Sequence, residues 1–149
     1  MLSAPIESAP KTHPTFRRAT RAIQILLVDD DAIVRRLLQT ILERAGYAVL
    51  AAEDGPSALE ISMWASFDML ITDFQMPGMN GFLLADRITK RRPGLPVLLI
   101  SGAVIEELPL DWIIERDWSF LPKPVDRVHL FETIDDYCRG GHHHHSPRN

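Results

Sequence analysis

The sequence predicts a doubly wound α/β fold, in which five parallel strands form one sheet and helices cover both of its faces. Short apolar runs of strand length alternate with segments whose apolar residues have helical spacing. Such units join by right-handed crossovers, which put helices on both faces of the sheet. The 149 residues are 46% apolar and 24% charged, which is enough for one globular domain with tails.

The first predicted strand is residues 23–28 (IQILLV), because acidic residues end this apolar run abruptly, as in a strand buried on both faces. A helix follows, and Gly46 stands where its C-terminal cap belongs. The apolar residues of this helix recur at spacings of three and four and predict one inward face: Val34, Leu37, Leu38, Ile41, Leu42 and Ala45.

The next two strands are predicted at residues 47–52 and 68–72. Between them, Gly55-Pro56-Ser57 begins a helix with proline in its first turn, and Leu59 and Met63 are expected on its apolar face. After the third strand come Asp73, a loop over 74–81, and a helix with Leu84 and Ile88 inward.

The last two strands are predicted at residues 95–100 and 118–121. Pro109 interrupts the segment between them, so its helix should be shortened to about 110–116 and preceded by a loop. A closing helix over 125–137 should turn Val128, Phe131 and Ile134 inward.

The domain organisation predicted is a flexible leader at 1–22, a folded domain at 23–139 and a disordered tail at 140–149. The leader carries three prolines and no apolar period. His142 to His145 in the tail are either native or an expression remnant. The sequence has no apolar run for a signal peptide or a membrane span, so we expect a soluble, cytoplasmic protein.

Charge and cysteine content exclude several classes. A net charge of -4 gives no general attraction to nucleic acid or to an anionic membrane. The single cysteine, Cys138, excludes an intramolecular disulfide and is expected to be a small buried apolar residue. Only His13 and His129 lie outside the histidine tract, so the folded part has no histidine cluster for zinc.

Chemically useful residues follow four of the five predicted strands: Asp29 and Asp30, Asp73, Ser101 and Lys123. They should meet at the carboxyl edge of the sheet. Three converging carboxylates repel one another unless a cation neutralises them, and Mg²⁺ is the natural choice because it also leaves positions open for a phosphoryl group. Ser101 offers a hydroxyl, and Lys123 a charge that can balance a carboxylate or a phosphoryl oxygen.

Each of these residues also has a purely structural interpretation. Asp31, or even Asp30, can cap the first helix, and we favour this role for Asp31. Asp73 can begin a turn, Ser101 can cap a loop, and Lys123 can simply be solvated. Their joint position at strand ends favours one site for a metal and a phosphate.

The motifs LLVDDD, LITDFQMPGMNG, VLLISG and FLPKP make residues 23–137 resemble the receiver domain of two-component response regulators, of the stand-alone type. The resemblance implies a flavodoxin-like sheet of order 2-1-3-4-5. It also implies that Asp73 takes a phosphoryl group from a histidine kinase or a histidine phosphotransfer protein. Four groups would hold Mg²⁺: the carboxylates of Asp29, Asp30 and Asp73 and the backbone carbonyl of Gln75.

By the same resemblance, Ser101 and Lys123 bind the phosphoryl group, Ser101 and Phe120 act as the switch, and the Lys123-Pro124 bond is cis. On composition alone, Phe120 is a core residue. A receiver assists its own phosphorylation and dephosphorylation but is not otherwise an enzyme.

The signal would leave through the face formed by the fourth helix, the fifth strand and the fifth helix, toward an unknown downstream protein or a homodimer partner. Pro109, Trp112 and Trp118 depart from the common pattern there, so the geometry of this contact stays open. The length leaves no room for an output domain, so we expect signalling by protein contact, with no direct binding of nucleic acid or membrane.

Three other function classes share part of this pattern. A receiver-like interaction module that works without phosphorylation is the main one. A phosphohydrolase of the haloacid-dehalogenase type also uses an aspartate nucleophile, but it needs a second aspartate where this chain has Gln75. A dinucleotide-binding protein is disfavoured, because neither a G-x-G-x-x-G nor a P-loop pattern follows the first strand.

Overall fold

The computed structural model, which describes residues 21–138, contains a five-stranded sheet of order β2-β1-β3-β4-β5. All neighbouring strands are parallel, as predicted. The strands are β1 (Gln24–Val28), β2 (Ala48–Ala52), β3 (Met69–Asp73), β4 (Val97–Ser101) and β5 (Ser119–Pro122). Each therefore lies within two residues of the range expected from its apolar run.

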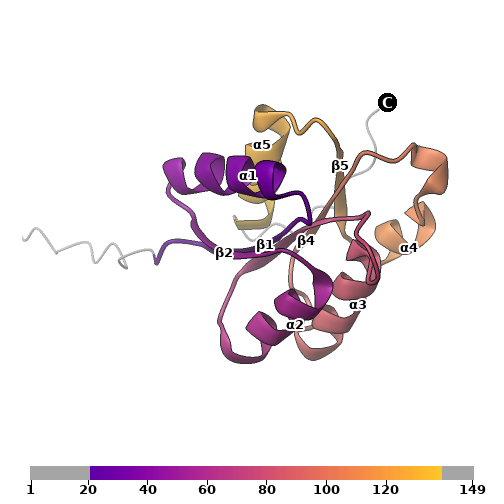
Figure 1. Ribbon diagram of the computed structural model, residues 1–149, viewed down its shortest axis with the longest axis horizontal. Coiled ribbons are helices and arrows are strands. Elements are labelled where there is room, and N and C mark those ends of the chain that lie inside the picture. Colours follow the sequence, from indigo (N-terminus) through magenta and orange to yellow (C-terminus); the bar gives the residue numbers. More distant parts are fainter. Residues whose placement is uncertain (1–20, 139–149) are drawn as a thin grey trace, which may run out of the picture.

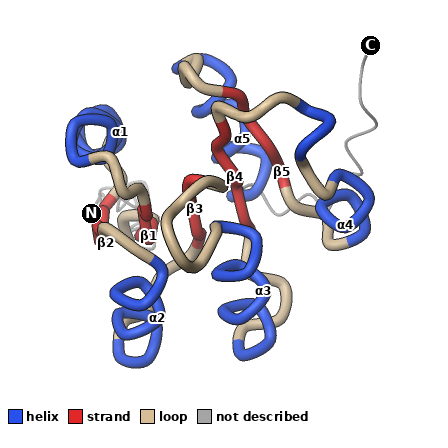
Figure 2. The backbone as a smooth tube through the Cα atoms, turned by 45° about the vertical axis from the view of Figure 1, so that its right-hand side comes forward, coloured by secondary structure: helices blue, strands red, loops and turns tan. Residues whose placement is uncertain are grey.

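Helices cover both faces of this sheet (Figure 1). They are α1 (Ala32–Arg44), α2 (Gly55–Trp64), α3 (Gly81–Arg91), α4 (Leu110–Glu115) and α5 (Arg127–Cys138), with a 3₁₀ turn at Ile105–Glu107. Figure 2 shows α1 and α5 on one side of the strands and α2 and α3 on the other, with α4 beyond α3. In the part of the chain that the model covers, no helix is long and apolar enough to cross a membrane.

The core has two halves because strand side chains alternate between the faces. Leu26 and Val28 of β1 pack on the side of α2 and α3, whereas Ile25 and Leu27 pack on the side of α1 and α5. All four side chains are almost fully buried, which explains why the run is apolar at every position rather than at alternate ones.

Local signals set the helix ends as expected. The carboxylate of Asp31 caps α1 by accepting hydrogen bonds from the N–H groups of Ile33 (2.9 Å) and Val34 (3.2 Å). Gly46 follows the C-cap of α1 with a φ of +97°, a conformation that costs glycine little. Pro109 directly precedes α4, which is short as predicted, and the Lys123-Pro124 peptide bond is cis, as the resemblance implied.

Four side chains predicted to point inward are in fact exposed: Leu37 (57%), Ala45, Met63 (66%) and Val128 (63%). Cys138 is exposed as well, so the buried setting expected for the cysteine is wrong. The part of each of these helices that packs on the sheet is narrower than the apolar spacing suggests. The buried apolar residues of these helices are Leu38 and Leu42 of α1, Ala58 of α2, and Leu130 and Ile134 of α5. Cys138 is the last residue of α5.

An aromatic cluster ties α4 to α3. The guanidinium carbon of Arg116 lies 5.2 Å from the ring centre of Phe82, 5.1 Å from Trp112 and 5.5 Å from Trp118. Arg116 also forms an ion pair of 3.3 Å with Asp86 of α3. Cation–π attraction and this ion pair therefore hold the short helix in place, which gives a local role to the two tryptophans that depart from the common pattern.

The predicted leader and tail lie almost wholly outside the residues that the model describes. Arg21, at the start of the described part, forms an ion pair of 2.8 Å with Asp68, just before β3.

Candidate functional site

The strand ends bring the predicted site residues together at one edge of the sheet. Asp29 directly follows β1, Asp73 and Ser101 are the last residues of β3 and β4, and Lys123 follows β5. Because all strands are parallel and in register, their carboxyl ends must lie at the same edge.

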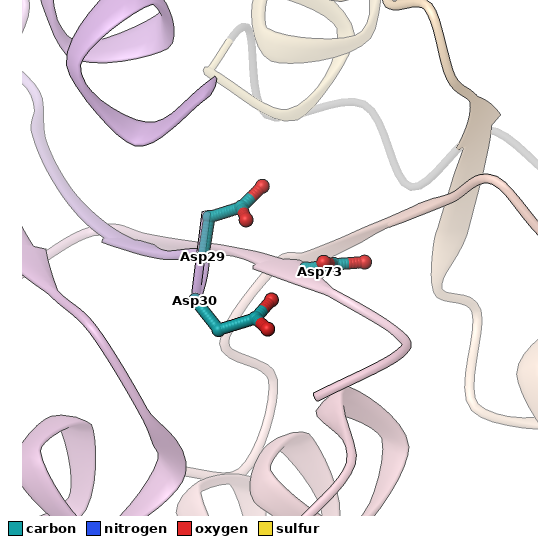
Figure 3. A group of neighbouring side chains, drawn as sticks. All are labelled: Asp29, Asp30 and Asp73. Atoms are coloured by element: carbon teal, nitrogen blue, oxygen red, sulfur yellow. The ribbon is translucent and has the colours of Figure 1, made fainter. Parts of the chain in front are cut away.

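Three carboxylates form the acidic part of this edge. One oxygen from each of Asp29, Asp30 and Asp73 lies within 4.8 Å of the other two. Asp29 is 1% exposed and Asp73 is 5% exposed, whereas Asp30 is open to solvent. Figure 3 shows the three carboxyl groups on the same side of the strand ends. The arrangement therefore has two buried charges and one that incoming solutes can reach.

Lys123 connects the two buried carboxylates. Its Nζ atom lies 3.1 Å from Asp29 Oδ2 and 3.1 Å from Asp73 Oδ2. Partial burial alone would lower the pKa of Lys123, but the hydrogen bonds to Asp73 and Asp29 raise it above its ordinary value. The lysine is therefore charged at neutral pH and neutralises part of the acidic cluster.

The pKa of Asp73 is raised, and burial is the main cause. The hydrogen bond from Lys123 opposes this shift, the neighbouring charge of Asp29 adds to it, and the backbone N–H of Gln75 opposes it. Burial thus favours the neutral form of Asp73, whereas the donors Lys123 and Gln75 favour the charged form.

Backbone groups hold the other oxygens of the buried carboxylates. The N–H of Asp31 donates to Asp29 Oδ1 (2.9 Å), and the N–H of Gln75 donates to Asp73 Oδ1 (3.2 Å). The guanidinium of Arg35 in α1 donates to the backbone carbonyl of Asp29 (2.7 Å). Both carboxylates are thus oriented from two sides before any ligand binds.

Ser101 links the ends of β4 and β5. Its side chain is fully buried, and its Oγ accepts a hydrogen bond from the N–H of Ala103 (2.9 Å). Its backbone carbonyl accepts a hydrogen bond from the N–H of Lys123 (2.8 Å). Since Oγ accepts in the first of these bonds, the hydroxyl can still donate its hydrogen to another oxygen.

Phe120 lies three residues before Lys123, in β5. Its side chain is partly buried and packs against the core half that lies under α2, α3 and α4. This is the core setting that composition suggests, and its role as a switch stays a prediction.

The loop after Asp73 closes tightly, a feature that the sequence analysis missed. The N–H of Gly81 donates to the carbonyl of Phe74 (2.9 Å), and a Cβ atom at Gly81 would overlap the backbone carbonyl oxygen of Asp73. The Asn80-Gly81 pair was an available signal, because asparagine caps helices and glycine permits a close backbone approach. Arg35 was also missed, since nothing in its spacing points to Asp29.

A comparison with family models decides the identity of the fold. The model of the response regulator receiver domain matches residues 25–135. The chain belongs to this family. Its function class is that of a phosphoacceptor response regulator, a signalling domain rather than a classical enzyme. Neither the interaction module that works without phosphorylation nor the phosphohydrolase is favoured.

Individual relatives agree with this assignment. The receiver domain is 38% identical over 113 residues to the response regulator receiver protein CpdR of Brucella abortus (strain 2308), covering 76% of this chain and 92% of CpdR. It is 36% identical over 114 residues to the transcriptional regulatory protein GlrR of Escherichia coli (strain K12), covering 75% of this chain but only 25% of GlrR.

A solved structure also matches. The signal receiver domain of an HD domain-containing protein from Pseudomonas fluorescens Pf-5 superposes with a TM-score of 0.74 at 28% identity, covering 80% of this chain and 96% of that one. The chain thus spans about a quarter of GlrR but 92% of CpdR, so family membership establishes the receiver domain and not the activity of a longer protein.

Proposed function

We propose that Asp73 is the phosphoacceptor and that its donor is a phosphohistidine on a histidine kinase or a histidine phosphotransfer protein. One observation carries this proposal: Asp73 is a buried carboxylate at the end of β3, within 3.1 Å of the Lys123 ammonium and next to two further carboxylates. This is the combination that receives a phosphoryl group and neutralises its charge.

In the reaction, a carboxylate oxygen of Asp73 attacks phosphorus in line with the phosphorus–nitrogen bond of the donor. That bond breaks, its electron pair returns to the imidazole, and an acyl phosphate forms on Asp73. The step is balanced, because the phosphoryl group moves from the nitrogen of the donor to the oxygen of Asp73. The chain contributes positioning and charge neutralisation, which supply most of the catalysis in phosphoryl transfer.

Lys123 and Ser101 would hold the transferred group. Lys123 bridges Asp29 and Asp73, and its ammonium can turn toward a phosphoryl oxygen on Asp73 without leaving the site. The Ser101 hydroxyl lies at the end of the neighbouring strand and can donate its hydrogen to another phosphoryl oxygen.

The residues present fit Mg²⁺. Receiver domains generally bind this ion at an acidic cluster, and here one oxygen from each of Asp29, Asp30 and Asp73 lies within 4.8 Å of the others. We infer that these three carboxylates hold the ion together with the backbone carbonyl of Gln75. When bound, the ion offsets the negative charge of the carboxylates and of the phosphoryl group.

The output would pass from Ser101 and Phe120 to the face formed by α4, β5 and α5. The backbone hydrogen bond from Lys123 to Ser101 supports this route, because it joins the end of β5 to the end of β4. Trp112 (55% exposed) and Ile114 (68%) on α4 and Val128 on α5 offer apolar contacts to a downstream protein or to a second copy of the chain. We also propose that residues 1–22 are a leader, that the receiver domain spans residues 23–139, and that the protein is cytoplasmic.

Intact-mass measurement tests the phosphoacceptor. The full chain is incubated with acetyl phosphate and Mg²⁺, and we expect the gain of one phosphoryl group. Asp73→Asn should gain none, and EDTA should prevent the gain in the unmodified chain. Asp68→Asn is the matched control, because Asp68 precedes the same strand at its other end and should be labelled normally. An unlabelled parent chain, or equal labelling of the Asp73 variant, contradicts the proposal.

A further inference from the structure

The C-terminal ends of α2 and α3 form an exposed surface that the phosphorylation site does not use. Met63 is 66% exposed and Trp64 is 70% exposed at the end of α2, and Arg87 and Arg91 are exposed on α3. Figure 1 shows the two helices side by side under the sheet. We call these four residues the α2–α3 patch.

Contacts between the two helices join Met63 to Arg91 and hold the two helix ends together. The guanidinium of Arg91 contacts the sulfur of Met63. Next to it, Arg92 donates hydrogen bonds to the carbonyls of Ser62 (2.9 Å) and Ala65 (2.6 Å), and it lies 4.1 Å from the ring centre of Phe67. The two helix ends are therefore fixed relative to each other before any partner binds, which lowers the entropic cost of docking.

The composition of the patch is that of a protein-binding surface. Tryptophan, methionine and arginine are enriched at the centres of protein interfaces, and exposed tryptophan and arginine commonly carry most of the binding energy. Within residues 21–138, neither Arg87 nor Arg91 forms an ion pair with a carboxylate. Both charges are therefore available to a partner.

The helix ends that carry Met63, Trp64 and Arg91 lie at the end of the sheet opposite to Asp73, and Arg87 lies one helical turn closer to it. Trp64 ends α2 and lies just before β3, whereas Asp73 is the last residue of β3. A strand of this length separates the two places by about 15 Å, at roughly 3.3 Å per residue. A partner on the patch would therefore leave the phosphorylation site open.

We propose that the α2–α3 patch docks an acidic segment of a partner protein, with an apolar side chain of that segment covering Trp64 and Met63 and its carboxylates pairing with Arg87 and Arg91. The positive charges of Arg87 and Arg91 favour an acidic occupant. The chain's own ends do not fit, because residues 1–20 carry three basic residues against one acidic residue and residues 139–149 carry two arginines and no acidic residue.

An anionic membrane fits the α2–α3 patch less well than an acidic protein segment does. Recognition of such membranes commonly uses clusters of about four to eight basic residues, which is two to four times the number of arginines in the patch. The net charge of the whole chain, -4, would add repulsion. Two arginines beside an apolar pair suit a short acidic protein segment better than an extended charged surface.

The test uses the full chain and a fluorescein-labelled synthetic peptide that carries leucines between glutamates. Fluorescence anisotropy should show saturable binding. Trp64→Ala, and separately Arg87→Glu with Arg91→Glu, should each weaken the affinity by about tenfold or more, as expected for central interface residues. A peptide with lysine in place of glutamate should prefer the charge-reversed variant to the parent chain.

Ile33→Ala and Arg36→Glu are the matched controls, since both residues are exposed but lie on α1, across the sheet. They should bind the peptide as the parent chain does, and all patch variants should still be phosphorylated by acetyl phosphate. The proposal is overturned if the parent chain does not bind the glutamate peptide, if the patch variants bind it unchanged, or if the α1 controls lose as much affinity. Binding only to phosphatidylglycerol vesicles overturns it in favour of a membrane contact.

Discussion

Replacing Lys123 by methionine should make the folded state depend on a divalent cation. The lysine is the positive group that lies between two carboxylates, Asp29 and Asp73, each of which is at least 95% buried. Methionine keeps much of the apolar stem but removes the charge. The two carboxylates would then face each other with no counter-charge from β5.

The size of this effect follows from the distances. Oxygens of the Asp29 and Asp73 carboxylates lie no more than 4.8 Å apart, and two unit charges at that separation repel by about 3.5 kcal/mol at an effective dielectric constant of about 20. The Lys123 side chain is 24% exposed, so water screens part of that repulsion, and we expect the free energy of unfolding to fall by about 2–3 kcal/mol in EDTA. A bound divalent cation at 100 times its dissociation constant stabilises a folded protein by about 2.7 kcal/mol, and this gain should be larger in the variant than in the parent chain.

Urea unfolding with and without Mg²⁺, followed by circular dichroism, measures both quantities. Lys90→Met is the matched control, because Lys90 is 73% exposed and pairs only with Asp86 within the described residues. It should change the unfolding free energy by less than about 0.5 kcal/mol. If Lys123→Met unfolds like the parent chain in EDTA, or if Mg²⁺ stabilises both chains equally, the reasoning about the bridge is wrong.

Four further substitutions probe other parts of the domain. Arg116→Ala removes a cation that lies over three aromatic rings, so urea unfolding should show a loss of about 1–2 kcal/mol, and an unchanged midpoint would contradict the role of the cluster. Gly81→Ala forces a Cβ atom against the carbonyl of Asp73 and should reduce both phosphorylation and thermal stability, whereas normal labelling with normal stability would show that the loop relaxes freely. Asp31→Ala removes a helix cap and should lower the free energy of unfolding by about 1 kcal/mol while phosphorylation continues. Asp30→Ala should slow phosphorylation with little loss of stability. If Asp30→Ala destabilises the fold and Asp31→Ala slows phosphorylation instead, the roles of the two residues are exchanged.

The sequence was sufficient to predict the strands and the residues at their ends. The central strands β1, β3 and β4 are apolar runs that are buried almost throughout, whereas the edge strands β2 and β5 are only partly buried. Polar residues such as Asp29 and Asp73 lie where the central strands end. Parallel pairing then makes the meeting of Asp29, Asp73 and Lys123 unavoidable, whatever the details of the loops.

Helix faces were harder to predict, because apolar spacing does not say how wide the buried stripe is. Leu37 and Leu38 are neighbours in α1 and fit the same helical period, yet only Leu38 is buried. Contacts made by long side chains were not predictable either. Arg35 reaches the backbone of Asp29, and Arg116 reaches Asp86 from 30 residues away in sequence, through conformations that only the packed structure determines.

The cluster around Arg116 also gives the molecule a built-in optical reporter. The chain has three tryptophans. Trp112 and Trp118 lie in or beside α4, with the Arg116 guanidinium close to both rings, whereas Trp64 lies on α2. The ring of Phe82 on α3 lies 5.8 Å from the Trp112 ring and 5.4 Å from the Trp118 ring, so a shift of α4 away from α3 changes the surroundings of two indoles at once. In a Trp64→Phe background, intrinsic fluorescence would therefore follow the movement of the signalling face in real time, without a label and in the same cuvette as the phosphorylation reaction.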